Sequence, residues 1–151
     1  MDLLGHLTPS DRQKAELVLA TADYCTLAAP DVSGIYLLPI NFGYSNGCIY
    51  IHSGKHGHKL DVFQDGTPVS LSIQHAVEVV PAPTPCKYTT HYMSVLGKGT
   101  ITRLDVPEQV QDGLNTIVAH YGAQPIAYAP ADLDRIFVYQ IKLESVSFKQ
   151  S

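Results

Sequence analysis

Charged residues are scarce in this sequence, and basic residues are the minority among them. Only 16% of the 151 residues are charged, and 10 lysines and arginines against 14 acidic residues leave a formal net charge of -4. A mildly acidic chain without a basic tail is a poor electrostatic match for nucleic acid or an anionic membrane surface. We therefore expect neither of these as a partner.

Long apolar runs are also missing. No stretch of the chain approaches the roughly 20 consecutive apolar residues that span a bilayer. The first six residues, MDLLGH, lack the basic start and the apolar core of a signal peptide. These absences predict a cytoplasmic protein.

Cysteine is rare and irregularly placed. Cys25, Cys48 and Cys86 are odd in number and far apart, which argues against a disulfide framework and against a zinc motif. The chain nevertheless has 45% hydrophobic residues and a length typical of one domain, so it can build a core without such crosslinks. We expect a single domain over residues 1–151.

The sequence predicts two long helices from their capping residues. The first is predicted over residues 8–19, with Thr8 as its N-cap. The second is predicted to begin at Asp105, which is followed three residues later by Glu108 as in a capping box. Gly122 is a natural C-terminal stop for it.

The clearest hairpin is centred on the pair Asn46-Gly47, which tolerates the positive φ angles of a tight turn. Its two strands are predicted over residues 35–44 and 48–53. Pro39 cannot donate a ladder hydrogen bond, so the first strand should lie at a sheet edge or carry a bulge.

Other segments rich in branched and aromatic residues predict further strands, and the parity of the last one changes near Glu144-Ser145, which indicates a bulge. The remaining expected segments are strands over residues 21–29, 69–74, 92–104 and 135–149, a turn over 30–34, a short helix over 58–63 and a proline-rich loop over 80–85. About six short strands with two or three helices predict a mainly β, closed or partly closed barrel with helices outside.

The run Gly54-Lys55-His56-Gly57-His58-Lys59 is a basic cluster in an acidic chain. Glycines let a ligand approach the backbone, Lys59 supplies a fixed charge, and a helix start offers free amides to an anion. Two interpretations stay open from these residues alone: a phosphate-binding loop and a solvated basic turn.

Side-chain catalysis and metal binding have weaker signals. His52, His56 and His58 lie close in sequence, but a zinc site needs three or four ligands on a fixed frame, so no metal is expected. The nucleophile-elbow pattern is missing as well. This favours a cofactor as the carrier of the chemistry.

The block over residues 36–59 resembles the FMN-binding split barrels related to pyridoxamine 5'-phosphate oxidase, in particular their nitroimidazole-resistance branch. The shared pattern is a proline-containing strand, an aromatic pair, a tight turn, a Tyr-x-His strand end and a Gly-x-Lys triplet. A weaker second match is the Ser94-Val95 strand. The residues of the first match are Pro39, Phe42, Tyr44, Asn46, Gly47, Tyr50, His52, Gly57 and Lys59.

This resemblance implies a Greek-key split β-barrel with two or three peripheral helices, which forms a homodimer and binds FMN between its subunits; FAD and a deazaflavin stay open as alternatives. It also implies roles for nine residues. Pro39, Ile40, Asn41 and Phe42 would border the isoalloxazine ring, Ser53, His58 and Lys59 would hold the phosphate, Ser94 would add a hydrogen bond, and His52 would lie near the ring as the catalytic candidate. The chain has no tryptophan to cover the ring.

The function implied is an FMN-dependent oxidoreductase that reduces a small, planar, electron-poor molecule such as a nitroheterocycle. Two alternatives remain, a vitamin B6 oxidase and a non-catalytic protein that binds flavin or haem, because one fold hosts all three. The dimer interface is expected on a hydrophobic strand face. The candidate faces are Tyr92, Ser94 and Leu96, or Phe137 and Tyr139.

Overall fold

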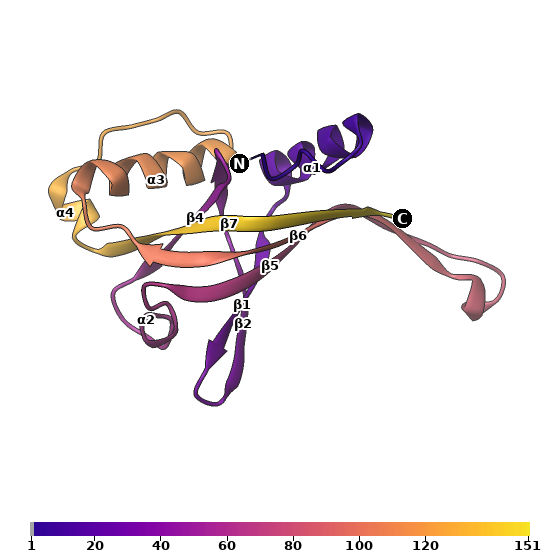
Figure 1. Cartoon of the computed structure of the whole chain (residues 1–151), viewed down its shortest axis with the longest axis horizontal. Helices are drawn as coiled ribbons and strands as arrows, with labels where there is room; N and C mark the ends of the chain where they lie inside the picture. The colour runs from indigo at the N-terminus through magenta and orange to yellow at the C-terminus, as the bar shows by residue number, and fades with distance from the viewer. Residues whose placement is uncertain (1) are drawn as a thin grey trace.

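The computed structural model describes residues 2–151 and contains one antiparallel sheet of seven strands in the order β2-β1-β5-β6-β7-β4-β3. The elements are α1 (Pro9–Thr21), β1 (Cys25–Asp31), β2 (Gly34–Ile40), β3 (Gly43–Ser45), β4 (Cys48–Gly54), α2 (Lys59–Val62), β5 (Thr67–Val80), the 3-10 helix η1 (Pro85–Lys87), β6 (Thr89–Arg103), α3 (Pro107–His120), α4 (Pro130–Leu133) and β7 (Ile136–Gln150). Figure 1 shows α1 and α3 along one side of the curved sheet, with the β1–β2 hairpin pointing away from the opposite side.

Helix α1 begins as predicted but continues further. The Thr8 hydroxyl accepts a hydrogen bond from the Asp11 N–H at 3.2 Å, which confirms the N-cap. The helix ends at Thr21, whose hydroxyl donates to the Leu17 carbonyl at 2.6 Å. The prediction that a strand begins at residue 21 is therefore wrong, and β1 starts only at Cys25.

The strand predicted over residues 35–44 is interrupted in the structure. Its first part, β2, pairs with β1 at the sheet edge, and its last part, β3, pairs with β4. The break falls at Asn41 and Phe42, because the Phe42 ring is fully buried and its N–H donates to the Tyr121 hydroxyl at 3.2 Å. The edge position expected for Pro39 is confirmed, since β2 is the outermost strand.

Two local turn and bulge predictions are confirmed. Asn46 and Gly47 have φ angles of 49° and 78°, as the tight β3–β4 turn requires. Between β6 and β7, Lys98 pairs with Ser145 while Gly99 pairs with Leu143, so Glu144 is the extra residue of a bulge. The bulge explains the change of parity that the sequence shows in the last strand.

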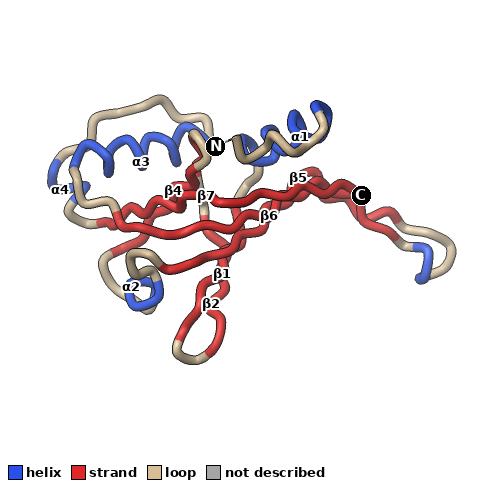
Figure 2. Tube along the Cα trace, viewed as in Figure 1, coloured by secondary structure: helices blue, strands red, loops and turns tan. Residues whose placement is uncertain are grey.

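Strand β5 is longer than predicted and forms an arm with β6. It runs to Val80, past an irregularity between His75 and Glu78. Figure 2 shows this arm extending beyond the rest of the molecule to a tip that contains η1. Val77 and Val79 on the arm are 59% and 60% exposed.

The predicted capping box of the second long helix is wrong. The N-cap of α3 is Val106, which has no side-chain cap. The Asp105 carboxylate lies instead 3.4 Å from the Arg103 Nε. The predicted stop is confirmed, because α3 ends at His120 and Gly122 has a φ of 89°.

Two hydrophobic clusters hold the fold together. The larger lies between the curved sheet and α1, and the smaller packs Val110 and Leu114 of α3 against Val138 of β7. All three cysteines are free, and burial raises the pKa of the Cys25 thiol to about 12, so this thiol is inert. None of the helices within residues 2–151 has the length and apolar character needed to cross a membrane.

Candidate functional site

The end of β4 sets the directions of two predicted site residues. Ile49 and Ile51 are fully buried, so by the two-residue period of a strand Ser53 also faces inward and His52 faces outward. Ser53 is 8% exposed, and its hydroxyl donates to the Gly54 carbonyl at 3.0 Å. Its partner in the β4–β7 ladder is Phe137.

Phe137 is the centre of a cation–aromatic cluster. The Lys55 ammonium lies 5.0 Å from the centroid of the Phe137 ring, and the Arg103 guanidinium carbon lies 4.3 Å from it. Both distances are within the range of a cation–π interaction. The Arg103 backbone N–H donates to Asp65 at 2.8 Å, which fixes the end of β6 beside this ring.

Arg103 and Phe137 were missed by the sequence interpretation as site residues. They are separated from Lys55 by tens of residues, and no local motif connects them. Pairing of β6 with β7 and of β7 with β4 brings them together. The Lys55–Phe137–Arg103 cluster is therefore a property of the sheet order.

The Phe137 ring borders two cavities. One, of about 280 Å³, lies beside α2 and contains Arg103. The other, of about 400 Å³, lies beside α3 and α4 and contains Lys55. Each cavity thus has one of the two cations.

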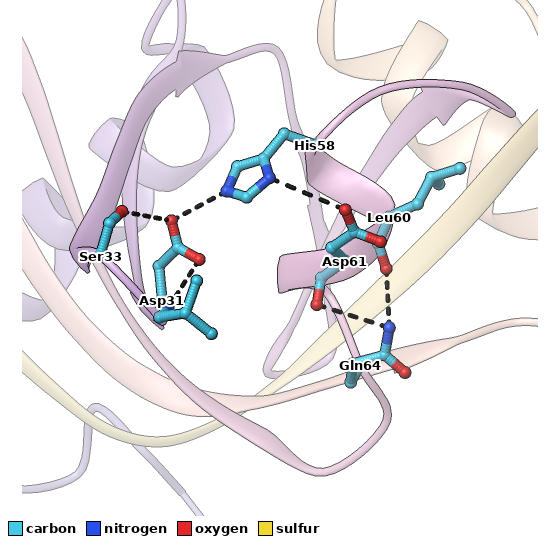
Figure 3. Close-up of polar contacts among 7 residues, drawn as sticks. Asp31, Ser33, His58, Leu60, Asp61 and Gln64 are labelled. Carbon is cyan, nitrogen blue, oxygen red and sulfur yellow. Dashed lines mark hydrogen bonds and ion pairs between the residues drawn. The ribbon is translucent and has the colours of Figure 1, made fainter.

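His58 is engaged by two carboxylates (Figure 3). Its Nε2 lies 2.8 Å from the Asp31 Oδ2, and its Nδ1 lies 3.8 Å from the Asp61 Oδ2. The Asp31 hydrogen bond raises the pKa of His58, and His58 in turn lowers the pKa of Asp31. The ring is thus committed to a contact between the loop before α2 and the β1–β2 turn, rather than free for a phosphate as predicted.

Lys59 is the first residue of α2, but the helix start predicted to offer free amides beside it is not supported. Helix α2 has only four residues, and the N–H groups of Leu60 and Asp61 already donate to the carbonyls of Gly57 and His58, so a helix-terminus anion site is not supported. Partial desolvation, and to a lesser extent the charge of Lys59, lower the pKa of His52. His52 lies near the end of β4 and Lys59 begins α2, so only a short loop separates them along the chain.

The residues predicted to border a flavin ring, 39–42, differ in their exposure to solvent. Pro39 and Asn41 are exposed and Ile40 is half-buried, but the Phe42 ring is fully buried and lies 4.4 Å from the His120 ring. The Phe42 side chain and N–H thus both contact other residues of the same chain. This corrects the expectation that Phe42 borders the flavin ring.

Asn41 and His52 belong to the same end of the β3–β4 hairpin. Gly43 pairs with Tyr50, and Asn41 and His52 each lie two residues beyond this pair in the same direction. Both residues are exposed. The β3–β4 ladder itself ends at the Gly43–Tyr50 pair, and His52 pairs on with Val138 of β7.

Ser94 is not brought to this site within one chain. It lies on β6 opposite Gln74 and Lys149, nine residues from Arg103. At about 3.3 Å per residue, roughly 30 Å of strand separates Ser94 from Arg103 along β6. Across residues 2–151, no group of three or more His, Cys, Asp or Glu side chains is arranged to hold a metal ion.

Known proteins of similar fold were found among solved structures. A candidate 5-nitroimidazole antibiotic resistance protein from Bacteroides thetaiotaomicron has a TM-score of 0.79 and 24% identity, covering 94% of this chain and 85% of its own. The FAD and heme binding protein from Mycobacterium smegmatis has a TM-score of 0.80 and 20% identity, covering 93% of this chain and 71% of its own. These likenesses confirm the predicted split-barrel fold.

Sequence comparisons give the family. No curated protein matches the chain significantly. A model of the family described as pyridoxamine 5'-phosphate oxidase matches residues 11–150, which is nearly the whole chain. The chain belongs to the pyridoxamine 5'-phosphate oxidase family.

Proposed function

We propose that this protein is a flavin-dependent oxidoreductase that binds FMN and reduces a small, planar, electron-poor substrate such as a nitroheterocycle. The observation that carries the proposal is the gathering of Lys55 and Arg103 over the Phe137 ring at the end of β4, in a chain whose net charge is -4, with Lys59 following at the start of α2. Such a local excess of cations suits a phosphate group.

The surrounding residues fit a flavin nucleotide. In this proposal Lys59 and Arg103 supply charge for the phosphate, and Ser53, which pairs with Phe137, adds a hydroxyl whose oxygen can still accept a hydrogen bond. Exposed Pro39 and Asn41 offer backbone and amide groups for the polar edge of the ring. When bound, the flavin supplies the electron-transfer chemistry, and the protein orients the reactants.

His52 is the residue proposed to serve the substrate. Its pKa is lowered, so its imidazole is neutral at neutral pH and has a nitrogen able to hold or accept a proton. It is exposed on the outer side of β4, on the same end of the hairpin as Asn41. A substrate between these two side chains would lie against the proposed ring position.

A second copy of the chain is proposed to complete the site. Leu37 and Leu96 are 64% and 54% exposed, and both line an apolar groove of about 460 Å³ on the outer sheet face. Ser94 lies on the same strand as Leu96 and far along it from the Phe137 cluster. In this proposal the Ser94 of one subunit therefore contacts the cofactor that is bound at the Phe137 cluster of the other subunit. The alternative interface through Tyr139 is not supported, since this residue is 1% exposed.

The decisive test is a flavin titration. Lys59→Ala removes a charge-assisted hydrogen bond of about 1.5–3 kcal/mol, so the Kd for FMN should rise roughly 10- to 150-fold. Riboflavin, which has no phosphate, should bind with unchanged affinity. Lys87→Ala, at the exposed tip of the arm, is the matched control and should change neither Kd.

Two results would count against the proposal. A protein that remains colourless and takes up no added FMN refutes flavin binding. Equal weakening of FMN and riboflavin by Lys59→Ala refutes the phosphate role of Lys59 and leaves flavin binding standing.

A non-catalytic flavin or haem carrier is the second candidate. The observation in its favour is the similar structure of a protein described as binding both FAD and heme. Steady-state turnover with a nicotinamide donor and a nitroimidazole supports the enzyme, and a flavin that is reduced without turnover supports the carrier. Oxidation of pyridoxamine phosphate in the same assay would instead indicate a vitamin B6 oxidase.

A further inference from the structure

The carboxylate of Asp31 is almost completely enclosed, although it lies at the turn of the β1–β2 hairpin. Its side chain is 9% exposed. The carboxylate accepts hydrogen bonds from the Val32 N–H at 2.8 Å and from the Ser33 hydroxyl at 3.2 Å, and these two bonds belong to the turn itself. A third contact, at 2.8 Å, joins the Asp31 Oδ2 to the Nε2 of His58, which is 27 residues away along the chain. Asp31 therefore ties the hairpin to the loop before α2 (Figure 3).

This loop, residues 54–58, contains one cation of the proposed site and leads directly to another. The Lys55 ammonium lies 5.0 Å from the centroid of the Phe137 ring, and Lys59 begins α2. Gly57 has a φ of 110°, a conformation that favours glycine, and glycine gives a loop more freedom than any other residue. The position of both lysines therefore depends on the contacts that hold the loop.

The two ends of α2 are held in different ways. At its C-terminal end the Phe63 ring is 3% exposed and lies 5.3 Å from the Tyr139 ring, which makes an apolar anchor. At its N-terminal end the His58 ring packs edge-on against Tyr36 at 5.4 Å and pairs with Asp31. The His58 side chain is half exposed, so at this end the attachment depends on a polar contact rather than on burial.

We propose that Asp31 is a positioning residue for anion binding: through His58 it holds residues 54–59 in the conformation that presents Lys59 to a phosphate group. The inference rests on the proposed function, because that function assigns the phosphate to Lys59. Asp31 touches no ligand in this arrangement and acts by excluding loop conformations that cannot bind. The apparent Kd equals the intrinsic Kd divided by the binding-competent fraction, so loss of the His58–Asp31 pair weakens binding without removing a ligand contact.

The same pair makes anion binding depend on pH. The titratable groups that face the His58 ring are Asp31 from β1, Tyr36 from β2 and Asp61 from α2. The Asp31 hydrogen bond raises the pKa of His58, whereas the Asp61 carboxylate lies further away, at 3.8 Å, and is 82% exposed. The ion pair is therefore complete below the ordinary histidine pKa of about 6.5 and weakens as the pH rises through the higher folded value. The loop is held most firmly on the acidic side of this transition.

The first experiment titrates FMN and riboflavin into the wild type and the Asp31→Asn protein. Asparagine keeps an oxygen for the Val32 N–H but removes the charge. The Kd for FMN should rise about 3- to 10-fold, between the effect of an exposed ion pair and that of a buried charged hydrogen bond, and the Kd for riboflavin should not change. Asp61→Asn removes the exposed carboxylate from the same ring and is the matched control, with both Kd values within about 2-fold of the wild type.

The pH profile separates positioning from a general structural role. Dividing the FMN Kd of Asp31→Asn by that of the wild type at each pH cancels the titration of the FMN phosphate itself. This ratio should be largest below about pH 6.5 and should fall toward one as the pH rises. In a His58→Gln background the effect of Asp31→Asn should not vary with pH, because glutamine donates a hydrogen bond without titrating.

Amide hydrogen exchange examines the loop without any flavin. The N–H groups of Asp61 and Val62 both donate to the His58 carbonyl, at 3.0 and 3.2 Å. If the pair holds this end of α2, both amides should exchange about 3- to 10-fold faster in Asp31→Asn than in the wild type, because local opening becomes more frequent.

Three results would overturn the inference. FMN could bind Asp31→Asn as tightly as the wild type, FMN and riboflavin could be weakened equally, or the Kd ratio could stay constant with pH. A wild type that binds no flavin would refute the proposed function instead. Inorganic pyrophosphate would then replace FMN as the probe of the loop, and equal titrations of the wild type and Asp31→Asn would overturn the inference as well.

Discussion

Gly43 is the point where β3 meets the backbone of α3, and replacing it should be costly. A Cβ atom built on Gly43 would clash with the Thr116 carbonyl oxygen and would lie 2.6 Å from the Thr116 carbonyl carbon and 2.7 Å from the Ile117 nitrogen. These obstacles are helix backbone, which cannot rotate away as a side chain can. Gly43→Ala must therefore displace α3 from the sheet.

The expected size of this effect follows from the cost of overpacking. Added carbon in a filled interior destabilises a protein by about 1–3 kcal/mol, and sometimes more. For a chain of this length each kcal/mol lowers the melting temperature by about 2–4 °C, so Gly43→Ala should lower it by roughly 2–12 °C. Because the chain has no tryptophan, calorimetry or circular dichroism is the suitable measurement.

Gly54→Ala is the matched control. Gly54 also lies in a strand, but a Cβ atom there meets nothing within 4 Å. The melting temperature of the Gly54→Ala protein should remain within about 2 °C of the wild type, as for an ordinary surface substitution. If Gly43→Ala melts as the wild type does, β3 and α3 are not in backbone contact and the packing described here is wrong.

Two further predictions concern the loops around the site. Tyr121→Phe leaves the partly buried Phe42 N–H without its acceptor, so chemical denaturation should show a loss of about 1–3 kcal/mol; an unchanged midpoint would refute that hydrogen bond. Asp31 raises the pKa of His58, so their contact stabilises fully below the ordinary histidine pKa of about 6.5 and is lost as the pH rises through the higher folded value. The melting temperature of the wild type relative to Asp31→Asn should therefore fall as the pH rises above about 6.5. A constant difference over this range would show that the His58–Asp31 pair does not titrate with folding.

The structure places the predicted site residues in different surroundings. His52 lies near the end of β4 and Lys59 begins α2, so only a short loop separates them along the chain. His58 is instead held by Asp31, which is 27 residues away and was taken for part of a turn. Ser94 lies on a distant part of β6, so its predicted role depends on a second copy of the chain.

The sequence by itself determined the features that depend on adjacent residues. Thr8 capped α1, Asn46-Gly47 formed the tight turn, and Gly122 followed the end of α3, because each is a backbone preference expressed within a few residues. The bulge at Glu144 was also readable, since a change of parity within one strand has few other causes.

Only the tertiary structure decided which side chains meet at the site. Burial of the Phe42 ring broke a segment that reads locally as one strand, and the pairing of β4, β6 and β7 gathered Lys55, Arg103 and Phe137. Such contacts depend on strand order and register, which a single bulge shifts by one residue. No local pattern in the chain encodes these contacts, because they form only after the sheet has curved around its core.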